Sequence, residues 1–149
     1  METEALSLFR KKFNLDQLTI QSNNNWNLSV RPGQMTLGSM VVSSVRGKQN
    51  FTDLDSQDGA SLTSILAMAE NTVLKLYGGV RINVICLMMQ DPIIHFHIIP
   101  RYNKPIMLYG TEWNDIDWPG PPVFKAVATT DKILMSVKND ILGFLGISK

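Results

Sequence analysis

The chain has 149 residues, a length typical of one domain and sufficient to bury a hydrophobic core. Lys and Arg total 14 and Asp and Glu total 13, which argues against a protein that binds nucleic acid through bulk charge. A hydrophobic content of 44% excludes a disordered chain, and no apolar run reaches the ~18 residues of a membrane span. We therefore expect one domain over 1–149 that partners neither nucleic acid nor membrane.

The single cysteine and the N-terminal segment indicate the compartment. Cys86 alone can form neither an internal disulfide nor a multi-cysteine zinc site. Residues 1–13 are amphipathic, with acidic residues before basic ones, and they lack the apolar stretch of a signal peptide. These features predict a reduced, cytoplasmic setting.

Hydrophobic patterns in the first third of the chain predict a short helix followed by strands. Over 2–13, apolar residues recur at three- and four-residue steps, which is typical of a helix. Alternation of apolar and polar residues predicts strands around 18–20 and over 26–30, separated by an asparagine-rich turn. The β-branched and apolar run over 35–45 predicts one long strand with a bulge at Gly38.

The clearest predicted helix covers 58–77, where apolar residues form a single stripe. Ser56 or Asp58 is expected to cap its start, because short polar side chains accept hydrogen bonds from the first backbone N–H groups. The Gly78-Gly79 pair is expected to end the helix. This helix therefore has one apolar face to bury.

The second half of the chain predicts two paired strands, a loop and a final helix. The near-continuous apolar run 81–90 and the segment 93–102 read as strands that pair across a turn at Asp91-Pro92. Residues 103–127 are rich in Pro, Gly and Trp and predict an ordered loop, and 133–145 have a helical apolar pattern. These elements predict one α+β domain with a mostly antiparallel sheet.

The two histidines of the chain are separated by one residue on a predicted strand. Because side chains alternate along a strand, His95 and His97 are expected on one face, together with Ile93. Three interpretations follow. The pair is structural, with partners that offset its burial; it binds a metal, with a third ligand from Cys86 or a carboxylate; or it is catalytic, with one neutral imidazole attacking phosphorus.

The residues around this pair carry a resemblance to a known family. The string His95–Arg101 resembles the end of the histidine triad (HIT) signature, in which three histidines alternate with apolar residues and Pro-Arg often follows. Residues 32–34, Pro-Gly-Gln, resemble the Pro-Gly-His segment of many HIT proteins. Asp91-Pro92 and Trp118–Pro122 resemble a bacterial HIT subgroup. The order of predicted elements also fits, so the resemblance covers nearly the whole chain.

The resemblance implies a HIT-like fold, with a long helix and terminal helices, and a nucleotide phosphate hydrolase or nucleotidyl transferase. Its substrate would be a purine nucleotide or dinucleotide, such as a dinucleoside polyphosphate or a nucleoside phosphoramidate. In the family the middle histidine becomes nucleotidylated, and water then releases the mononucleotide. Aligned on Pro100, His95 takes the middle place, His97 the third and Ile93 the first. We expect His95 as nucleophile, His97 as support at the phosphate, and the Ile93 carbonyl to orient His95.

Asn83, Gln90 and Arg101 are the further candidates for substrate binding. Gln90 is near, but out of register with, a glutamine that precedes the histidine strand in many HIT enzymes. Arg101 suits a phosphate charge and Asn83 a phosphate or sugar, although both also suit structural roles at strand ends. Gln34 stands where the family often has histidine and retains hydrogen-bonding groups. We expect no metal and no cofactor, since no third ligand has matching spacing.

The Trp118–Pro122 loop has two interpretations. Its prolines, glycine and tryptophan make a stiff turn that covers the sheet edge, or it forms a lid over the nucleotide or a dimer contact. Trp113 and Trp118 are candidates to stack on a base. Cys86 and the methionine-rich segment 87–89 are expected in the core.

Two classes of function are compatible with the sequence. The first is the metal-independent HIT hydrolase or transferase described above. The second is a catalytically weakened HIT-fold nucleotide-binding protein, which Ile93 and the absence of a Gly-rich loop favour. The resemblance also implies a homodimer, for which we expect the 58–77 helix and its neighbouring strand as the interface.

Overall fold

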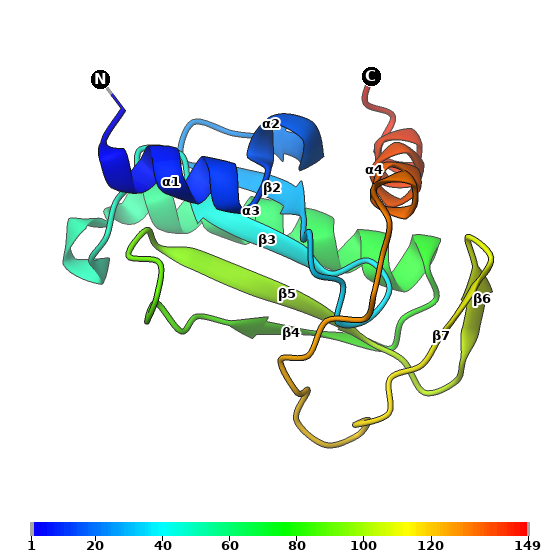
Figure 1. Cartoon of the computed structure of the whole chain (residues 1–149). Coiled ribbons are helices and arrows are strands. Elements are labelled where there is room, and N and C mark those ends of the chain that lie inside the picture. Colours follow the sequence, from blue (N-terminus) through cyan, green and yellow to red (C-terminus); the bar gives the residue numbers. More distant parts are fainter. Residues whose placement is uncertain (1, 149) are drawn as a thin grey trace.

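A five-stranded antiparallel sheet lies at the centre of the fold, with the strand order β1-β2-β3-β5-β4 (Figure 1). The computed structural model describes residues 2–148. A separate two-stranded hairpin, β6-β7, follows β5 in the chain. This is the mostly antiparallel α+β architecture that the sequence predicts. The strands are β1 (Thr19–Ser22), β2 (Trp26–Val30), β3 (Met40–Ser44), β4 (Arg81–Ile85), β5 (His95–Arg101), β6 (Ile106–Leu108) and β7 (Thr111–Trp113).

Helices cover both faces of the sheet. α3 packs on one face, where α4 completes the main hydrophobic core, and α1 packs on the opposite face over a smaller apolar cluster (Figure 1). Within residues 2–148, no helix combines the length and the apolar content needed to cross a membrane. The helical elements are α1 (Glu4–Lys12), α2 (Leu15–Leu18), η1 (Phe51–Asp53), α3 (Ser56–Asn71), the π-helical turn η2 (Thr72–Leu76) and α4 (Asp131–Leu145).

Alternation along β5 separates the main core from the opposite face. Ile94 and Ile98 are fully buried in the main core under α3. Each such side chain contributes roughly 1.5–3 kcal/mol by leaving water, so they hold the strand firmly from one side. His95 and His97 lie on the other face, as the strand pattern predicts. The core thus fixes the position of both imidazoles.

The strand expected over 35–45 is shorter in the structure and exists only as β3. The residues before it form a loop around the buried side chain of Gln34. The amide oxygen of Gln34 accepts hydrogen bonds from the N–H groups of Gly38 and Ser39, and its nitrogen donates to the Ser39 carbonyl. Gly38 has φ +84°, so it is a left-handed turn residue rather than the expected bulge.

The strand expected over 81–90 also ends early, at Ile85. β4 pairs with β5 only as far as the pair between Ile85 and His97. Met88 then adopts φ +53°, a left-handed conformation that cannot continue a strand. Residues 86–92 therefore form a loop, and this loop borders the histidines.

Helix α3 begins differently from the prediction. Asp55 is its N-cap, in place of Ser56 or Asp58, and its carboxylate accepts hydrogen bonds from the N–H groups of Gln57 and Asp58. The Asp58 carboxylate accepts from the Asp55 N–H in return, which completes a capping box. A short polar side chain caps the helix, as predicted, but the capping residue is Asp55.

The expected loop over 103–127 contains the β6-β7 hairpin. Tyr109 and Gly110 both have positive φ, at +57° and +68°, which is the geometry of a tight two-residue hairpin turn. The strands are three residues each, and the surrounding Pro, Gly and Trp residues mask their pattern in the sequence. The short helix α2 was likewise not predicted, because it is only four residues long.

Candidate functional site

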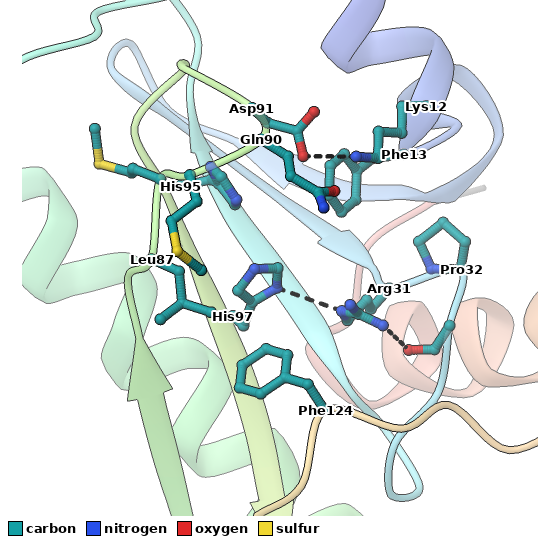
Figure 2. Close-up of a pocket in the computed structure, with 13 residues that line it drawn as sticks. Lys12, Phe13, Arg31, Pro32, Leu87, Gln90, Asp91, His95, His97 and Phe124 are labelled. Atoms are coloured by element: carbon teal, nitrogen blue, oxygen red, sulfur yellow. Dashed lines mark hydrogen bonds and ion pairs between the residues drawn. The ribbon is translucent and has the colours of Figure 1, made fainter.

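The two histidines of β5 lie in a cavity of about 630 Å³. The end of α1, the β2–β3 loop, the β4–β5 loop and the segment between β7 and α4 wall this cavity (Figure 2). Its lining residues are Lys12, Phe13, Arg31, Pro32, Gly33, Leu87, Met88, Met89, Gln90, Asp91, His95, His97 and Phe124. Four segments far apart in the sequence thus meet over the histidine strand.

The backbone fixes the tautomer of His95. Its Nδ1 lies 2.6 Å from the carbonyl oxygen of Ile93. Because a carbonyl only accepts hydrogen bonds, Nδ1 carries a proton, and in the neutral ring Nε2 keeps its lone pair. The Ile93 side chain is itself fully buried beside Phe9 and Phe13. The orienting contact therefore comes from the backbone at position 93 and requires no histidine there.

Helix α1 covers the His95 ring. The ring centroids of Phe9 and Phe13 lie 5.2 and 5.8 Å from that of His95. His95 is consequently only 3% exposed. The aromatic cover lowers the local polarity around the imidazole and restricts access to it.

His97 is a neutral neighbour of His95. The two ring centroids are 5.0 Å apart in an edge-to-face arrangement. Burial, followed by the positive charge of Arg31, lowers the pKa of His97 to about 4. Arg31 Nε donates a hydrogen bond of 3.3 Å to His97 Nδ1, so the ring proton is placed on Nε2. His97 therefore has one N–H donor that does not face Arg31.

Two cations line the cavity, and they differ in their partners. Lys12 forms a 2.8 Å ion pair with Asp91, which joins the end of α1 to the β4–β5 loop (Figure 2). Arg31 donates through Nη1 to the Gly33 carbonyl and forms no ion pair with any carboxylate in residues 2–148. Burial lowers the pKa of Arg31. The cavity therefore holds one guanidinium whose charge has no carboxylate partner among those residues.

Arg101 lies on the same sheet face as the histidines but outside the cavity. Its guanidinium donates to both carboxylate oxygens of Asp115, at 2.7 and 3.2 Å, to Asn83 Oδ1 at 2.8 Å and to the Gly120 carbonyl at 2.7 Å. The Trp118 ring lies 5.3 Å from the guanidinium carbon. Arg101 is only 2% exposed. Every edge of this cation is used within the protein.

Comparison with solved structures identifies the architecture. A histidine triad protein from Marinobacter aquaeolei is 22% identical, with a TM-score of 0.69 over 91% of this chain and 93% of that chain. A Zn-bound histidine triad family protein from Mycobacterium smegmatis is 13% identical, with a TM-score of 0.63 over 93% and 95%. Plasmodium falciparum diadenosine triphosphate hydrolase is 11% identical, with a TM-score of 0.64 over 87% and 77%. The chain has the histidine triad fold.

No protein-family model matches the sequence, and no curated protein matches it at a significant level. At 22% identity or less, the structural likeness establishes the HIT fold, and the activity must be argued from the site. The resemblance on which the fold was predicted from sequence is therefore confirmed.

Within this HIT fold, the structure brings together some of the predicted site residues and separates others. Gln90 lines the cavity with His95 and His97. Asn83 and Arg101 lie together near the other end of β5 and bind each other. The cavity is thus built from the histidines and Gln90, without the other two candidates.

Trp113 and Trp118 of the segment after β6 contact other parts of the protein rather than the cavity. Trp113 is 3% exposed and donates through Nε1 to the Leu108 carbonyl, so it offers no face to a base. Trp118 covers Arg101 at the end of the sheet opposite the histidines. Further along the same segment, the Phe124 ring lies 5.3 Å from that of His97 and closes one side of the cavity. The expected core position of Cys86 and 87–89 is wrong: Cys86 is half-buried in the β4–β5 loop, and Leu87 and Met89 are exposed at the cavity, because the strand ends at Ile85.

Several contributors to the cavity were missed from sequence, among them Lys12, Arg31 and Phe124. Lys12 is the last residue of α1 and Phe124 lies in the segment between β7 and α4, and neither belongs to a motif. A signal for Arg31 was available, because it is the sole charged residue between Trp26 and Val45. A charge inside an otherwise uncharged sheet segment needs a partner or a ligand.

Residues 2–148 contain no group of three His, Cys, Asp or Glu side chains placed to hold a metal ion. The metal interpretation of the histidine pair requires such a third ligand. Among the described residues, the groups at the cavity instead suit hydrogen bonding and charge neutralisation at an anion.

Proposed function

We propose that the protein is a nucleotide phosphate hydrolase or nucleotidyl transferase that works through a nucleotidyl-His95 intermediate. The observation that carries this proposal is the 2.6 Å contact between His95 Nδ1 and the Ile93 carbonyl. It leaves Nε2 unprotonated on a ring that borders the cavity, which is the state a nucleophilic imidazole requires. The HIT fold and the diadenosine triphosphate hydrolase among its structural neighbours add support.

The chemistry proceeds in two displacements. His95 Nε2 attacks the α-phosphorus of the substrate, and the bond from phosphorus to the leaving group breaks as the P–N bond to His95 forms. A leaving phosphate oxygen departs as an anion, and a leaving nitrogen takes up a proton from water and departs as an amine. Water then attacks the same phosphorus, the P–N bond breaks, a proton is released and the mononucleotide departs. The neutral His97 donates its Nε2–H to a phosphate oxygen in both steps.

The shape and charge of the cavity fit a nucleotide better than a larger partner. A volume of about 630 Å³ suits one nucleotide unit with its phosphates. Phe13, Phe124 and the apolar side chains of the β4–β5 loop provide surfaces for a base, and Arg31 provides positive charge. Gln90, at the cavity edge, offers an amide to the ribose or phosphate.

The test uses a dinucleoside polyphosphate and a nucleoside phosphoramidate as separate substrates, with and without chelator. We expect release of mononucleotide from at least one of them, unaffected by chelator. Rapid acid-free denaturation followed by mass spectrometry should detect a nucleotidyl adduct on the peptide that contains His95. Absence of both turnover and adduct for both substrates would remove the hydrolase proposal.

The alternative is a nucleotide-binding protein with weakened turnover. The specific observation in its favour is the 3% exposure of His95 beneath Phe9 and Phe13. This cover leaves little of the His95 ring open to an incoming phosphorus. Tight nucleotide binding by calorimetry, together with no adduct and no turnover, would support this second function.

We also propose a homodimer, as the family resemblance implies. β4 is an edge strand of the sheet and leaves one row of backbone groups without a strand partner in residues 2–148. Edge strands of this kind favour pairing with another strand. β4 and the preceding helix α3 are the proposed interface. Sedimentation at micromolar concentration should give a dimer, and a monomer alone would contradict the proposal.

A further inference from the structure

Arg31 is the first residue of the β2–β3 loop, and its side chain contacts both His97 and the Gly33 carbonyl of that loop. Two of the three guanidinium nitrogens are used, because Nε donates to His97 Nδ1 and Nη1 donates to the Gly33 carbonyl (Figure 2). No residue of 2–148 accepts a hydrogen bond from Nη2. The side chain is thus held in place by neutral acceptors and retains donor capacity in the cavity.

The charge of Arg31 is the second part of the argument. A partly buried cation normally pairs with a carboxylate, as Arg101 does with Asp115 and Lys12 does with Asp91. Arg31 has no such pair among the described residues. Its uncompensated charge lies beside His97, in the cavity where the proposed function places a phosphate.

We propose that Arg31 binds the substrate phosphate through Nη2, which has no acceptor in residues 2–148, and, through Nε, positions His97 with its proton on Nε2. Nothing in the sequence motif assigns this role. The inference rests on the proposed function only in that the cavity takes a nucleotide phosphate. It does not require that His95 attack that phosphate.

The two contacts of Arg31 reinforce each other. With Nδ1 of His97 occupied as an acceptor, Nε2–H is the donor that remains for a phosphate oxygen. Arg31 and His97 then present two neighbouring donors to one phosphate. Because burial and the Arg31 charge lower the pKa of His97 to about 4, that ring is neutral near pH 7, and Arg31 supplies positive charge that His97 does not.

A binding measurement tests the phosphate contact. The affinities for AMP and adenosine are measured by calorimetry for the native protein, Arg31→Gln, Arg31→Lys and Arg46→Gln. Arg46 is exposed in the turn after β3, so Arg46→Gln removes the same charge outside the cavity. Thermal unfolding of each variant establishes that it is folded, and Arg31→Lys keeps a cation if Arg31→Gln fails to fold.

We expect the native protein to prefer AMP over adenosine and Arg31→Gln to lose about tenfold to a hundredfold of that preference, as for a charged hydrogen bond. Arg31→Lys should retain part of it and Arg46→Gln all of it. A native protein without preference for AMP, or a preference that survives in folded Arg31→Gln, would overturn the phosphate role. AMP binding without any turnover would leave this inference standing and remove only the hydrolase proposal.

A spectroscopic measurement tests the positioning of His97. Imidazole ¹⁵N chemical shifts report which ring nitrogen carries the proton. We expect the Nε2–H form of His97 in the native protein and a mixture of both forms in Arg31→Met and Arg31→Leu, since neither side chain has an N–H donor. An unchanged tautomer in both variants would overturn the positioning role.

The same spectra follow the titration of His97. His95, Asp91, Lys12 and Arg31 are the charged or titratable groups that influence this ring. Loss of the Arg31 charge should raise the pKa of His97 from about 4 toward its ordinary value, whereas Arg46→Gln should leave it in place. A His97 pKa that is equal in all variants would contradict close contact between the two side chains.

Discussion

The two ends of strand β5 hold arginines in opposite states. At one end, Arg101 is buried, and Asp115, Asn83 and the Gly120 carbonyl accept its hydrogen bonds. At the other end, Arg31 faces a cavity beside His97, and no carboxylate of residues 2–148 pairs with it. Arg101, which is paired with Asp115, links two segments of the structure, whereas Arg31 retains the capacity to bind an anion.

This difference separates the arginine that the motif indicates, Arg101, from the arginine that lines the cavity, Arg31. Arg101 follows the histidines in the sequence and shares their face of the sheet, but it lies four residues along the strand from His97. Asp115 then neutralises it from the segment after β7. Arg31 comes from β2–β3, so only the fold brings it to the histidines. Arg101 is therefore close to the histidines in the sequence, whereas Arg31 is the arginine that contacts His97.

The largest expected effect is that of removing His95, the proposed nucleophile. His95→Asn eliminates Nε2 while a side-chain N–H remains near the Ile93 carbonyl, so the fold should persist. We expect turnover to fall by several decades and the nucleotidyl adduct to disappear, because the covalent step is lost. Nucleotide affinity measured by calorimetry should change little. A mild loss of activity with the adduct still present would show that His95 is not the nucleophile.

The next effect tests the structural end of β5. Arg101→Met leaves the buried Asp115 carboxylate without its partner, and breaking such a pair costs about 3–5 kcal/mol of unfolding free energy. Denaturant unfolding measures this loss. Arg81 lies directly across from Arg101 on β4 and is exposed, so Arg81→Met is the matched control, with a change within about 0.5 kcal/mol.

The same Arg101 variant also sharpens the contrast with Arg31. In the folded protein, at low denaturant and low temperature, Arg101→Met should keep the preference for AMP over adenosine. A lost preference together with unchanged stability would mean that Arg101 contacts the phosphate and that the two ends of β5 have exchanged roles.

The third effect concerns the supporting histidine. His97→Asn keeps an acceptor near Arg31 and removes the Nε2–H donor. We expect kcat to fall by about 10²–10³, the usual loss for one donor that stabilises a transition state, with the adduct on His95 still detectable. Steady-state kinetics provides the comparison. Equal losses for the His95 and His97 variants would favour the binding protein over the hydrolase.

Much of this site was predictable because strand alternation is a strong local signal. The placement of His95 and His97 on one face, and of Ile94 and Ile98 in the core, follows from the two-residue period of a strand. The role of the Ile93 carbonyl was also predictable, since a backbone carbonyl is present whatever the side chain. The central sheet and its long helix α3 follow from similarly regular patterns.

The remaining parts depend on contacts between distant segments, which periodicity cannot reveal. The 35–45 strand is interrupted because the Gln34 side chain organises a loop through hydrogen bonds to nearby backbone groups. The partner of Arg101 is Asp115, which no motif identifies. Lys12 reaches the site by pairing with Asp91 across 79 positions of the sequence. Each of these contacts exists only once the sheet has formed.

A smaller effect is the dependence of stability on pH. The unfolded chain protonates His97 near its ordinary pKa of 6.5, whereas the folded protein does so only near 4. Between these values the unfolded state binds more protons, so the free energy of unfolding decreases as the pH falls from 6.5 toward 4. Denaturant unfolding from pH 7 to 5 should show a shallower decrease for His97→Asn than for the native protein. Identical slopes would indicate that His97 is not held neutral.

The smallest expected effect is that of the side chain at position 93, where the usual first histidine of the triad is absent. Ile93 packs against Phe9, Phe13 and Val41, while its carbonyl orients His95. Ile93→Val should therefore cost about 0.5–1.5 kcal/mol of unfolding free energy and leave kcat and the His95 adduct unchanged. Ile93→His places a polar ring in the same apolar cluster, so it should lower stability further without raising activity. A rise in kcat for Ile93→His would show that a side chain, and not the backbone, is needed at this position. The cavity beside the histidines would then be an active site that lacks one catalytic side chain. Arg31 would serve nucleotide binding in a protein with weakened turnover.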